Sequence, residues 1–117
     1  GGFPLVLDEA MAVGVTDAGP DPYDLLCTAL AGSISMGLRK RADAEGWPLE
    51  EVTTRVVYRE LPPPPDPEAP TDAFDVSVRL VGGELTEEQR AALLAAVPET
   101  QLHDTLIRTS EITVRLE

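Results

Sequence analysis

Hydrophobic and polar residues alternate with a period of two in two central stretches of the chain. Between residues 52 and 59, valine, threonine and tyrosine at even positions alternate with threonine, arginine and valine at odd ones. Between 74 and 80, phenylalanine, valine and leucine alternate with aspartate, serine and arginine. This alternation predicts two strands, each with one buried face. The proline-rich segment 61–70 between them cannot join a ladder and predicts a stiff connection between antiparallel strands.

Two further stretches have helical periodicity. Apolar residues in 21–45 recur on two overlapping faces, which predicts a helix buried on most of its circumference. It should begin near Asp21, with Pro22 in its first turn, and stop at Gly46. A second helix should open at the capping box Thr86-Glu87-Glu88-Gln89 and run to Val97 before a proline. Residues 100–107 predict a short helix or turn.

The two ends of the chain complete the predicted order. Residues 3–7 are a short extended run ending at Asp8, the glycines and prolines of 11–22 predict a loop, and residues 112–116 alternate as a last strand. The order β-α-β-β-α-(α)-β is an α+β pattern in which helices pack on an antiparallel sheet. We expect one domain over residues 1–117.

The charge and the cysteine content limit which partners, metals and cell compartment we expect. The formal net charge of −12 repels phosphate backbones and anionic headgroups, so we expect neither nucleic acid nor membrane binding. No apolar run approaches the ~18 residues of a membrane span, and no signal peptide is seen. Cys27 is the only cysteine, so no internal disulfide can form, and one histidine makes a zinc site improbable. We expect a cytoplasmic protein without metal or cofactor.

One segment carries a family resemblance. Residues 16–41, TDAGPDPYDLLCTALAGSISMGLRKR, resemble the OsmC/Ohr family of small dimeric thiol peroxidases, whose pattern there is close to G-P-x-P-Y-E-L-L-x-A-A-L-x-x-C. Residues 46–49 (GWPL), 85–90 (LTEEQR) and 111–117 (EITVRLE) fit the same family. The resemblance implies an OsmC-like fold with a long buried central helix, in an intertwined homodimer. Such families carry further N-terminal strands, so the sheet is expected to be trimmed here.

The resemblance also implies where the site lies. The family mechanism needs a thiolate that attacks the peroxide and a second thiol that resolves the sulfenic acid as a disulfide. The matching positions are Ser33 and, in the Thr-Gln-Leu-His segment, Thr100. A serine hydroxyl has a far higher pKa than a thiol and no sulfenic state, so we expect the usual chemistry to be lost. The pocket candidates are Tyr23, Asp24, Ser33, Thr100 and His103.

Two enzymatic alternatives remain open. Cys27 lies six residues before Ser33, which is about 240° around a helix, so it points elsewhere and is best interpreted as a small buried hydrophobe. If it did react with peroxide, an external thiol would have to restore it. Ser33 and His103, with Asp24 or Asp104, could instead form a hydrolase triad, although no G-x-S-x-G elbow surrounds Ser33.

Three functions therefore compete. The first is a non-peroxidase binding or accessory module that takes an apolar small molecule at the dimer interface. The second is an enzyme, either a thiol peroxidase through Cys27 or a hydrolase through Ser33 and His103. The third is a structural role in which the dimer itself is the working part.

Overall fold

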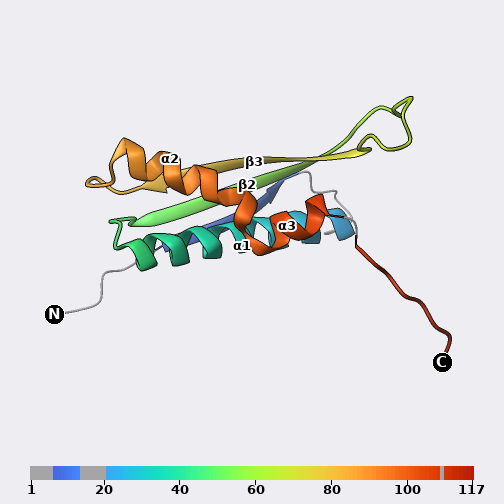
Figure 1. Cartoon of the computed structure of the whole chain (residues 1–117), viewed down its shortest axis with the longest axis horizontal. Coiled ribbons are helices and arrows are strands. Elements are labelled where there is room, and N and C mark those ends of the chain that lie inside the picture. The colour runs from blue at the N-terminus through green and yellow to red at the C-terminus, as the bar shows by residue number, and fades with distance from the viewer. Residues whose placement is uncertain (1–6, 14–20, 109) are drawn as a thin grey trace.

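The structure is a computed structural model that describes residues 7–13, 21–108 and 110–117 (Figure 1). The two central strands expected from alternation and all the expected helices are present, and residues 100–107 prove to be helical. In chain order the elements are β1 (Leu7–Val13), α1 (Pro22–Glu45), β2 (Glu51–Glu60), β3 (Asp72–Val81), α2 (Glu87–Ala96), the 3-10 turn η1 (Val97–Glu99) and α3 (Gln101–Ile107).

The long helix α1 begins and ends where its local sequence dictates. Asp21 is the N-cap, and its side chain accepts a hydrogen bond from the backbone N–H of Asp24. Pro22 follows at the first helical position, where a missing N–H costs nothing. At the other end Gly46 adopts φ 71°, a left-handed conformation that favours glycine and closes the helix. The predicted bounds of this helix are confirmed.

The sheet has three strands in the order β1-β2-β3. Strands β2 and β3 are antiparallel, as predicted, and pair Val52 with Leu80 and Val56 with Val76. Strand β1, however, pairs with β2 in parallel, so the expectation of a wholly antiparallel sheet is wrong. The physical reason is that α1 itself is the crossover between β1 and β2, and a helical crossover of this length allows parallel pairing.

The first strand is also displaced from its predicted position. It covers Leu7–Val13, whereas the prediction ended it at Asp8 and began a loop at residue 11. The charged residue Asp8 predicts a strand end, but its carboxylate accepts hydrogen bonds from Arg39 and from the N–H of Val52 within the fold. The rest of the predicted strand 3–7, and residues 14–20 of the predicted loop, lie outside the described residues.

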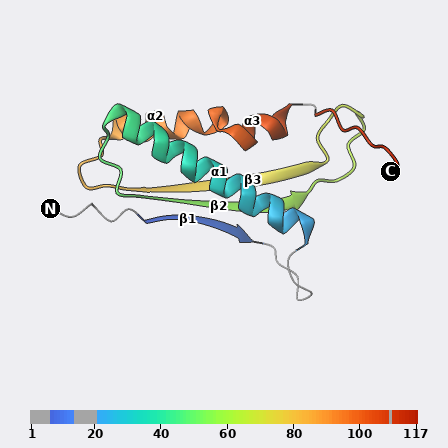
Figure 2. The ribbon, with the colours of Figure 1, turned by 90° about the horizontal axis from the view of Figure 1, so that it is seen from below.

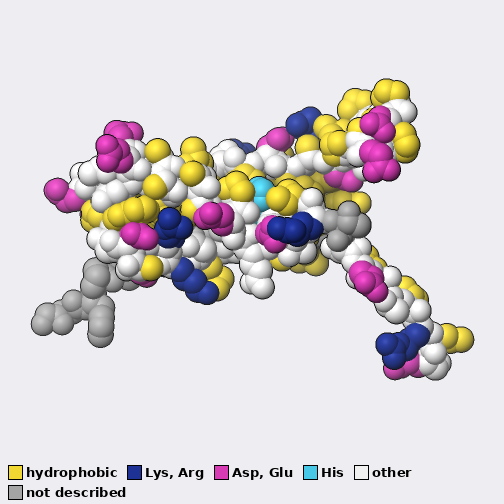
Figure 3. All heavy atoms as spheres, viewed as in Figure 1, with side chains coloured by type: hydrophobic (Ala, Val, Ile, Leu, Met, Phe, Trp, Pro, Cys, Tyr) yellow, Lys and Arg dark blue, Asp and Glu magenta, His cyan; other side chains and the backbone are white. Residues whose placement is uncertain are grey.

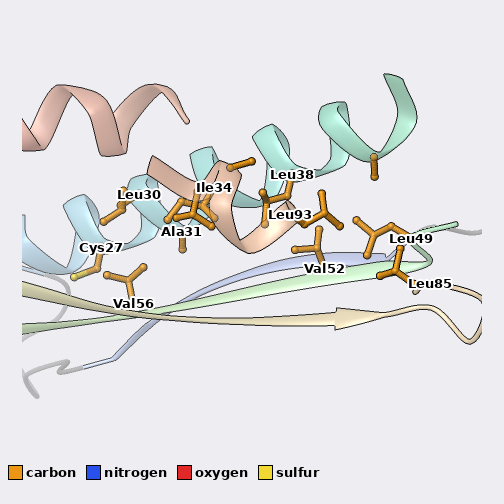
Figure 4. Close-up of a cluster of buried hydrophobic side chains, with 13 residues drawn as sticks. Cys27, Leu30, Ala31, Ile34, Leu38, Leu49, Val52, Val56, Leu85 and Leu93 are labelled. Atoms are coloured by element: carbon orange, nitrogen blue, oxygen red, sulfur yellow. The ribbon is translucent and has the colours of Figure 1, made fainter. Parts of the chain in front are cut away.

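The core lies between α1 and the sheet. Figure 4 shows side chains of α1 and the sheet meeting in one layer, and Figure 2 shows α2 and α3 running alongside α1. The fully buried members of this layer include Cys27, Ile34, Leu38, Val52, Val56 and Leu93. Because even positions of β2 and β3 face α1, the odd positions form the open polar face of the sheet.

The C-terminal segment departs from the prediction. Residues 110–117 extend away from the body without pairing to any described strand, so the expected strand over 112–116 is not formed within this chain (Figure 1). Ile112, Val114 and Leu116 are 84, 87 and 99% exposed. The alternation predicted an extended backbone correctly, but an extended segment becomes a strand only when a neighbouring edge supplies hydrogen bonds.

A partly shielded ion pair joins β1 to α1. Two nitrogens of Arg39 donate to the two carboxylate oxygens of Asp8 at 3.2 and 3.0 Å, and a third donates to the carbonyl of Leu49 at 2.6 Å. Burial raises the pKa of Asp8, but hydrogen bonds from Arg39 and the N–H of Val52 outweigh this and hold it below 3.8. The carboxylate form is thus favoured in the folded chain.

This pair predicts a specific dependence of stability on pH. Because the folded pKa of Asp8 is depressed, its stabilisation is present above the unfolded pKa and is lost as the pH falls through the folded pKa. Asp8→Asn should lower the free energy of unfolding by about 1–2 kcal/mol at neutral pH. Urea unfolding should show the difference from wild type shrinking below about pH 4.

The exposed pair on the open face provides the control. Asp75 also pairs with an arginine, Arg59, but both side chains are 57% exposed, against 28% for Asp8 and 16% for Arg39. Exposed pairs contribute little, so Asp75→Asn should leave the fall in the free energy of unfolding at low pH almost unchanged. An equal effect of the two substitutions would mean that the Asp8 contacts do not contribute to stability.

Candidate functional site

Ser33 lies on the side of α1 that faces α3. Its Oγ accepts a hydrogen bond from the backbone N–H of Leu102 at 3.1 Å. That N–H belongs to the first turn of α3, where helical amides have no partner within the helix. The N-cap of α3 is Thr100, but its hydroxyl donates instead to the carbonyl of Val97 at 2.6 Å. Ser33 therefore supplies, from 69 residues away, a capping acceptor for α3.

Thr100 is buried close to Ser33. A Cβ atom added at Gly37, one turn beyond Ser33, would lie only 2.6 Å from Cγ2 of Thr100. Ser33 and Thr100 line one cavity of about 500 Å³, which we call the Ser33 cavity. Its remaining wall comes from α1, η1 and the start of α3, and includes Ala29, Met36, Lys40, Glu99, Gln101 and Leu102.

His103 and Tyr23 lie in a different place. Both line a larger cavity of about 790 Å³, which we call the hairpin cavity because the connection between β2 and β3 forms its rim. Its walls come from α1, β3 and α3. Among the hydrogen bonds of the described residues, none joins Ser33 to His103. Ser33 and Thr100 thus line one cavity, Tyr23 and His103 line the other, and Asp24 lines neither, which does not favour a Ser-His pair acting together.

Asp24 serves the start of α1. In addition to the bond from its own N–H to Asp21, its carboxylate accepts from the N–H of Asp21 at 3.1 Å, which completes a reciprocal capping box. Only 7% of Asp24 is exposed. A first-turn carboxylate also interacts favourably with the helix dipole. Its contacts are therefore those of a helix cap.

Cys27 is fully buried in the core between α1 and β2. Burial raises the pKa of its thiol, and the nearby Asp24 carboxylate raises it further. Reactive cysteines require the opposite environment, one that is accessible and electropositive, because the thiolate is the nucleophile. The geometry matches the interpretation of Cys27 as a small buried hydrophobe.

The sequence reasoning missed the pair Tyr58 and Asp72. The Tyr58 hydroxyl donates to the Asp72 carboxylate, and this hydrogen bond is the main cause that raises the pKa of Tyr58. Tyr23 stacks on Tyr58 with ring centroids 4.3 Å apart and an interplanar angle of 19°. Strand alternation predicts that Tyr58 lies on the buried face. Its hydrogen-bond partner Asp72, at the base of the hairpin, depends on the register between β2 and β3, which alternation does not give.

The described part of the chain holds neither a candidate metal site nor a candidate membrane-spanning helix. No group of three or more histidine, cysteine, aspartate or glutamate side chains is placed to hold a metal there. Among the helices that the structure describes, none has the length and hydropathy of a membrane span.

The comparisons with known proteins agree with the arrangement of elements. Among solved structures, the chain is similar to an OsmC-like hydroperoxide resistance protein from Jannaschia sp. CCS1, with 21% identity over 90% of this chain and 71% of that one and a TM-score of 0.60. At that identity the likeness shows the fold. No curated protein matches the chain. A family model described as OsmC-like protein matches residues 15–117, and the chain therefore belongs to the OsmC-like protein family.

Proposed function

We propose that this member of the family does not reduce peroxides and instead binds an apolar small molecule as a dimer. The observation that carries the proposal is the environment of Ser33. The resemblance to the family implies that this position belongs to the peroxide-attacking cysteine. Here a serine hydroxyl occupies it and caps α3 by accepting a hydrogen bond from the N–H of Leu102. A hydroxyl in a structural hydrogen bond offers no sulfenic chemistry.

Cys27 does not compensate for that loss. It has no exposed surface, and burial raises the pKa of its thiol. A peroxide would have to enter the layer between α1 and β2 and meet a protonated sulfur there. This supports a binding role over a relocated peroxidase.

The exposed apolar surface supports a dimer. On α1, Leu25 and Met36 are 61 and 62% exposed, and the exposed Ala29 lies between them on the same face of the helix. This face is opposite the one that packs on the sheet. The C-terminal segment adds a second exposed apolar surface, visible as the extended tail in Figure 3. Apolar patches of this kind mark surfaces that another chain covers, and we infer that a second copy covers both.

The same arrangement would create the binding site. Met36 belongs both to the exposed face of α1 and to the wall of the Ser33 cavity. A partner helix lying on that face would close the cavity, whose volume suits a small organic molecule. The bound molecule would then lie between the two chains, with Ser33 and Thr100 in the wall.

The test is peroxide consumption with dithiothreitol or lipoamide as the reductant. The natural protein should show no turnover above the uncatalysed rate, whereas the double variant Ser33→Cys with Thr100→Cys should turn over. A thiolate at position 33 would attack the O–O bond and release an alcohol, and the resulting sulfenic acid would be reduced, through a disulfide and loss of water, by the added dithiol. Cys27→Ser in the double variant should leave that turnover intact. Turnover by the natural protein that disappears in Cys27→Ser would overturn the proposal.

A further inference from the structure

Strand β3 has a free edge. It pairs with β2 on one side, and the described residues include no strand on its other side. At the end of β3 this edge is occupied, because Arg90 of α2 donates to the carbonyls of Leu80 and Gly82 at 2.7 and 2.8 Å. Among the described residues, no hydrogen bond of this kind occupies the edge between residues 74 and 79. An open edge of that length is a template for another strand.

The apolar row of β3 is only half-buried. On the face turned to α1, the central residues of β2 are fully buried, whereas the residues paired with them on β3 keep part of their surface exposed. The pairs are Val52 with Leu80, Thr54 with Val78 and Val56 with Val76. The difference follows from position in the sheet, because β2 has a strand on each side and β3 has one on a single side. An apolar strand beside β3 would therefore remove this row from water.

The C-terminal segment has the pattern of such a strand. Residues 110–117 are extended and pair with none of the described strands. Ile112, Val114 and Leu116 alternate with polar residues and are almost fully exposed. Figure 1 shows the segment running away from the body of its own chain, so we assign it to the β3 edge of a second copy. Adding an extended segment to a sheet edge is a common mode of protein recognition.

Charge determines the direction and the register of this pairing. On its open polar face, β3 carries Asp75, Ser77 and Arg79. An antiparallel segment with Arg115 opposite Asp75 also brings Thr113 opposite Ser77 and Glu111 opposite Arg79. Every other register that keeps the apolar residues on one face forms at most one pair of opposite charges. Opposite charges directly across two strands stabilise the pair, and like charges destabilise it.

The same register matches the apolar faces. It places Ile112 opposite Val78, Val114 opposite Val76 and Leu116 opposite Phe74. Each of these contacts joins an exposed residue of the segment to a half-buried residue of β3. A shift by one residue would turn every apolar side chain of the segment to the polar face, so the alternation opposes it.

The charged groups of this register are available for pairing. Among the described residues, Arg79, Glu111 and Arg115 form no ion pair. Asp75 already pairs with Arg59, but its side chain is 57% exposed and its carboxylate can accept a second arginine. The register therefore leaves the existing ion pair intact and adds one on each side of Ser77.

We propose that residues 110–117 of a second copy pair antiparallel with β3, with Glu111 opposite Arg79 and Arg115 opposite Asp75. The exchange is reciprocal, because a symmetric dimer uses the same contact twice. Each chain thus gives one strand and receives one. This inference rests on the dimer proposed above and adds the place where the C-terminal segment binds.

Disulfide formation between chains tests the register. One chain carries Ser77→Cys, the other carries Thr113→Cys, and the two are co-expressed with different tags. Residues directly opposite in antiparallel strands have Cα atoms about 4.5–5.5 Å apart, which suits a disulfide. Arg55→Cys is the control, because Arg55 is opposite Ser77 on β2 and lies one strand farther from the segment. The 77–113 link should form in at least tenfold higher yield than the 55–113 link.

The outcomes separate this inference from the proposed dimer. Equal yields of the two links, or no 77–113 link in a protein that sediments as a dimer, would overturn the register and leave the dimer standing. A link within one chain that carries both Ser77→Cys and Thr113→Cys would place the segment on its own β3 and reject the exchange. A natural protein that sediments as a monomer would overturn both the dimer and the exchange.

A charge exchange tests the ion pair itself. Arg79→Glu would face Glu111 with a like charge, and Glu111→Arg would do the same to Arg79, so each should weaken association about threefold. The two substitutions together restore opposite charges and should return the association constant to near its natural value. Arg55→Glu, with the same change of charge one strand away, should not be rescued by Glu111→Arg. Losses that simply add in the double variant would reject the pairing of Glu111 with Arg79.

Discussion

Met36→Asp is expected to convert the protein from a dimer to a monomer without unfolding it. In one chain Met36 is 62% exposed, so an aspartate there remains solvated and costs little beyond helix propensity. In the proposed dimer the same carboxylate would be buried against the partner's α1 without a counter-charge. Burying an unpaired charge costs several kcal/mol, which shifts a dimer equilibrium by two or more orders of magnitude. Sedimentation equilibrium over a range of concentrations measures this shift.

Leu94 provides a matched control for this substitution. It lies on α2, is 61% exposed and is also an apolar helical residue, but it does not belong to the exposed apolar face of α1 that we propose as the interface. Leu94→Asp should therefore carry the same helix cost and leave association unchanged. Two variants with equal association constants would show that α1 does not form the interface. Deleting residues 110–117 would then determine whether the exposed C-terminal segment holds the two chains together instead.

The features that the sequence predicted well are those decided by neighbours in the chain. The bounds of α1 follow from Asp21, Pro22 and Gly46, which act within one turn of the residues they cap. The two central strands follow from the alternation over residues 52–59 and 74–80, and β3 ends at Val81, before the paired glycines. These local signals do not depend on how the rest of the molecule folds.

The features that the sequence did not predict depend on distant partners. Alternation cannot say which edge a strand joins, so β1 was assigned to an antiparallel sheet and the C-terminal segment to a strand, although that segment pairs with none of the described strands. Strand β1 was also predicted too short, because Asp8 is a charged residue in the sequence, although Arg39 pairs with its carboxylate in the fold.

The site shows the same division. The family resemblance indicated that Ser33 and Thr100 lie near one another, and the structure places both in one cavity. It could not indicate that Ser33 caps α3, because that hydrogen bond joins a side chain to a backbone amide 69 residues away. Nor could it show that His103 faces a different cavity, since a short helix can present a residue to either side.

Gly37→Ala is expected to destabilise the protein, although alanine is the better helix former. At an open helical position this change stabilises by about 1 kcal/mol, and Gly32 is such a position because a Cβ there meets nothing within 4 Å. At Gly37 the new Cβ would lie 2.6 Å from Cγ2 and 3.3 Å from Cβ of Thr100. Overpacking of this kind costs about 1–3 kcal/mol. Urea unfolding should thus move the two variants in opposite directions.

Thr100→Ser tests the cause of that effect. It removes the Cγ2 atom that the new methyl would strike but keeps the hydroxyl that donates to Val97. Combining it with Gly37→Ala should recover most of the lost stability, which gives a favourable coupling energy in a double-mutant cycle. The cycle and the Gly32→Ala control are best measured in the Met36→Asp background, so that dimer formation does not contribute. If the two effects simply add, a methyl at position 37 does not meet Thr100, and the close contact between these two residues does not cause the loss of stability.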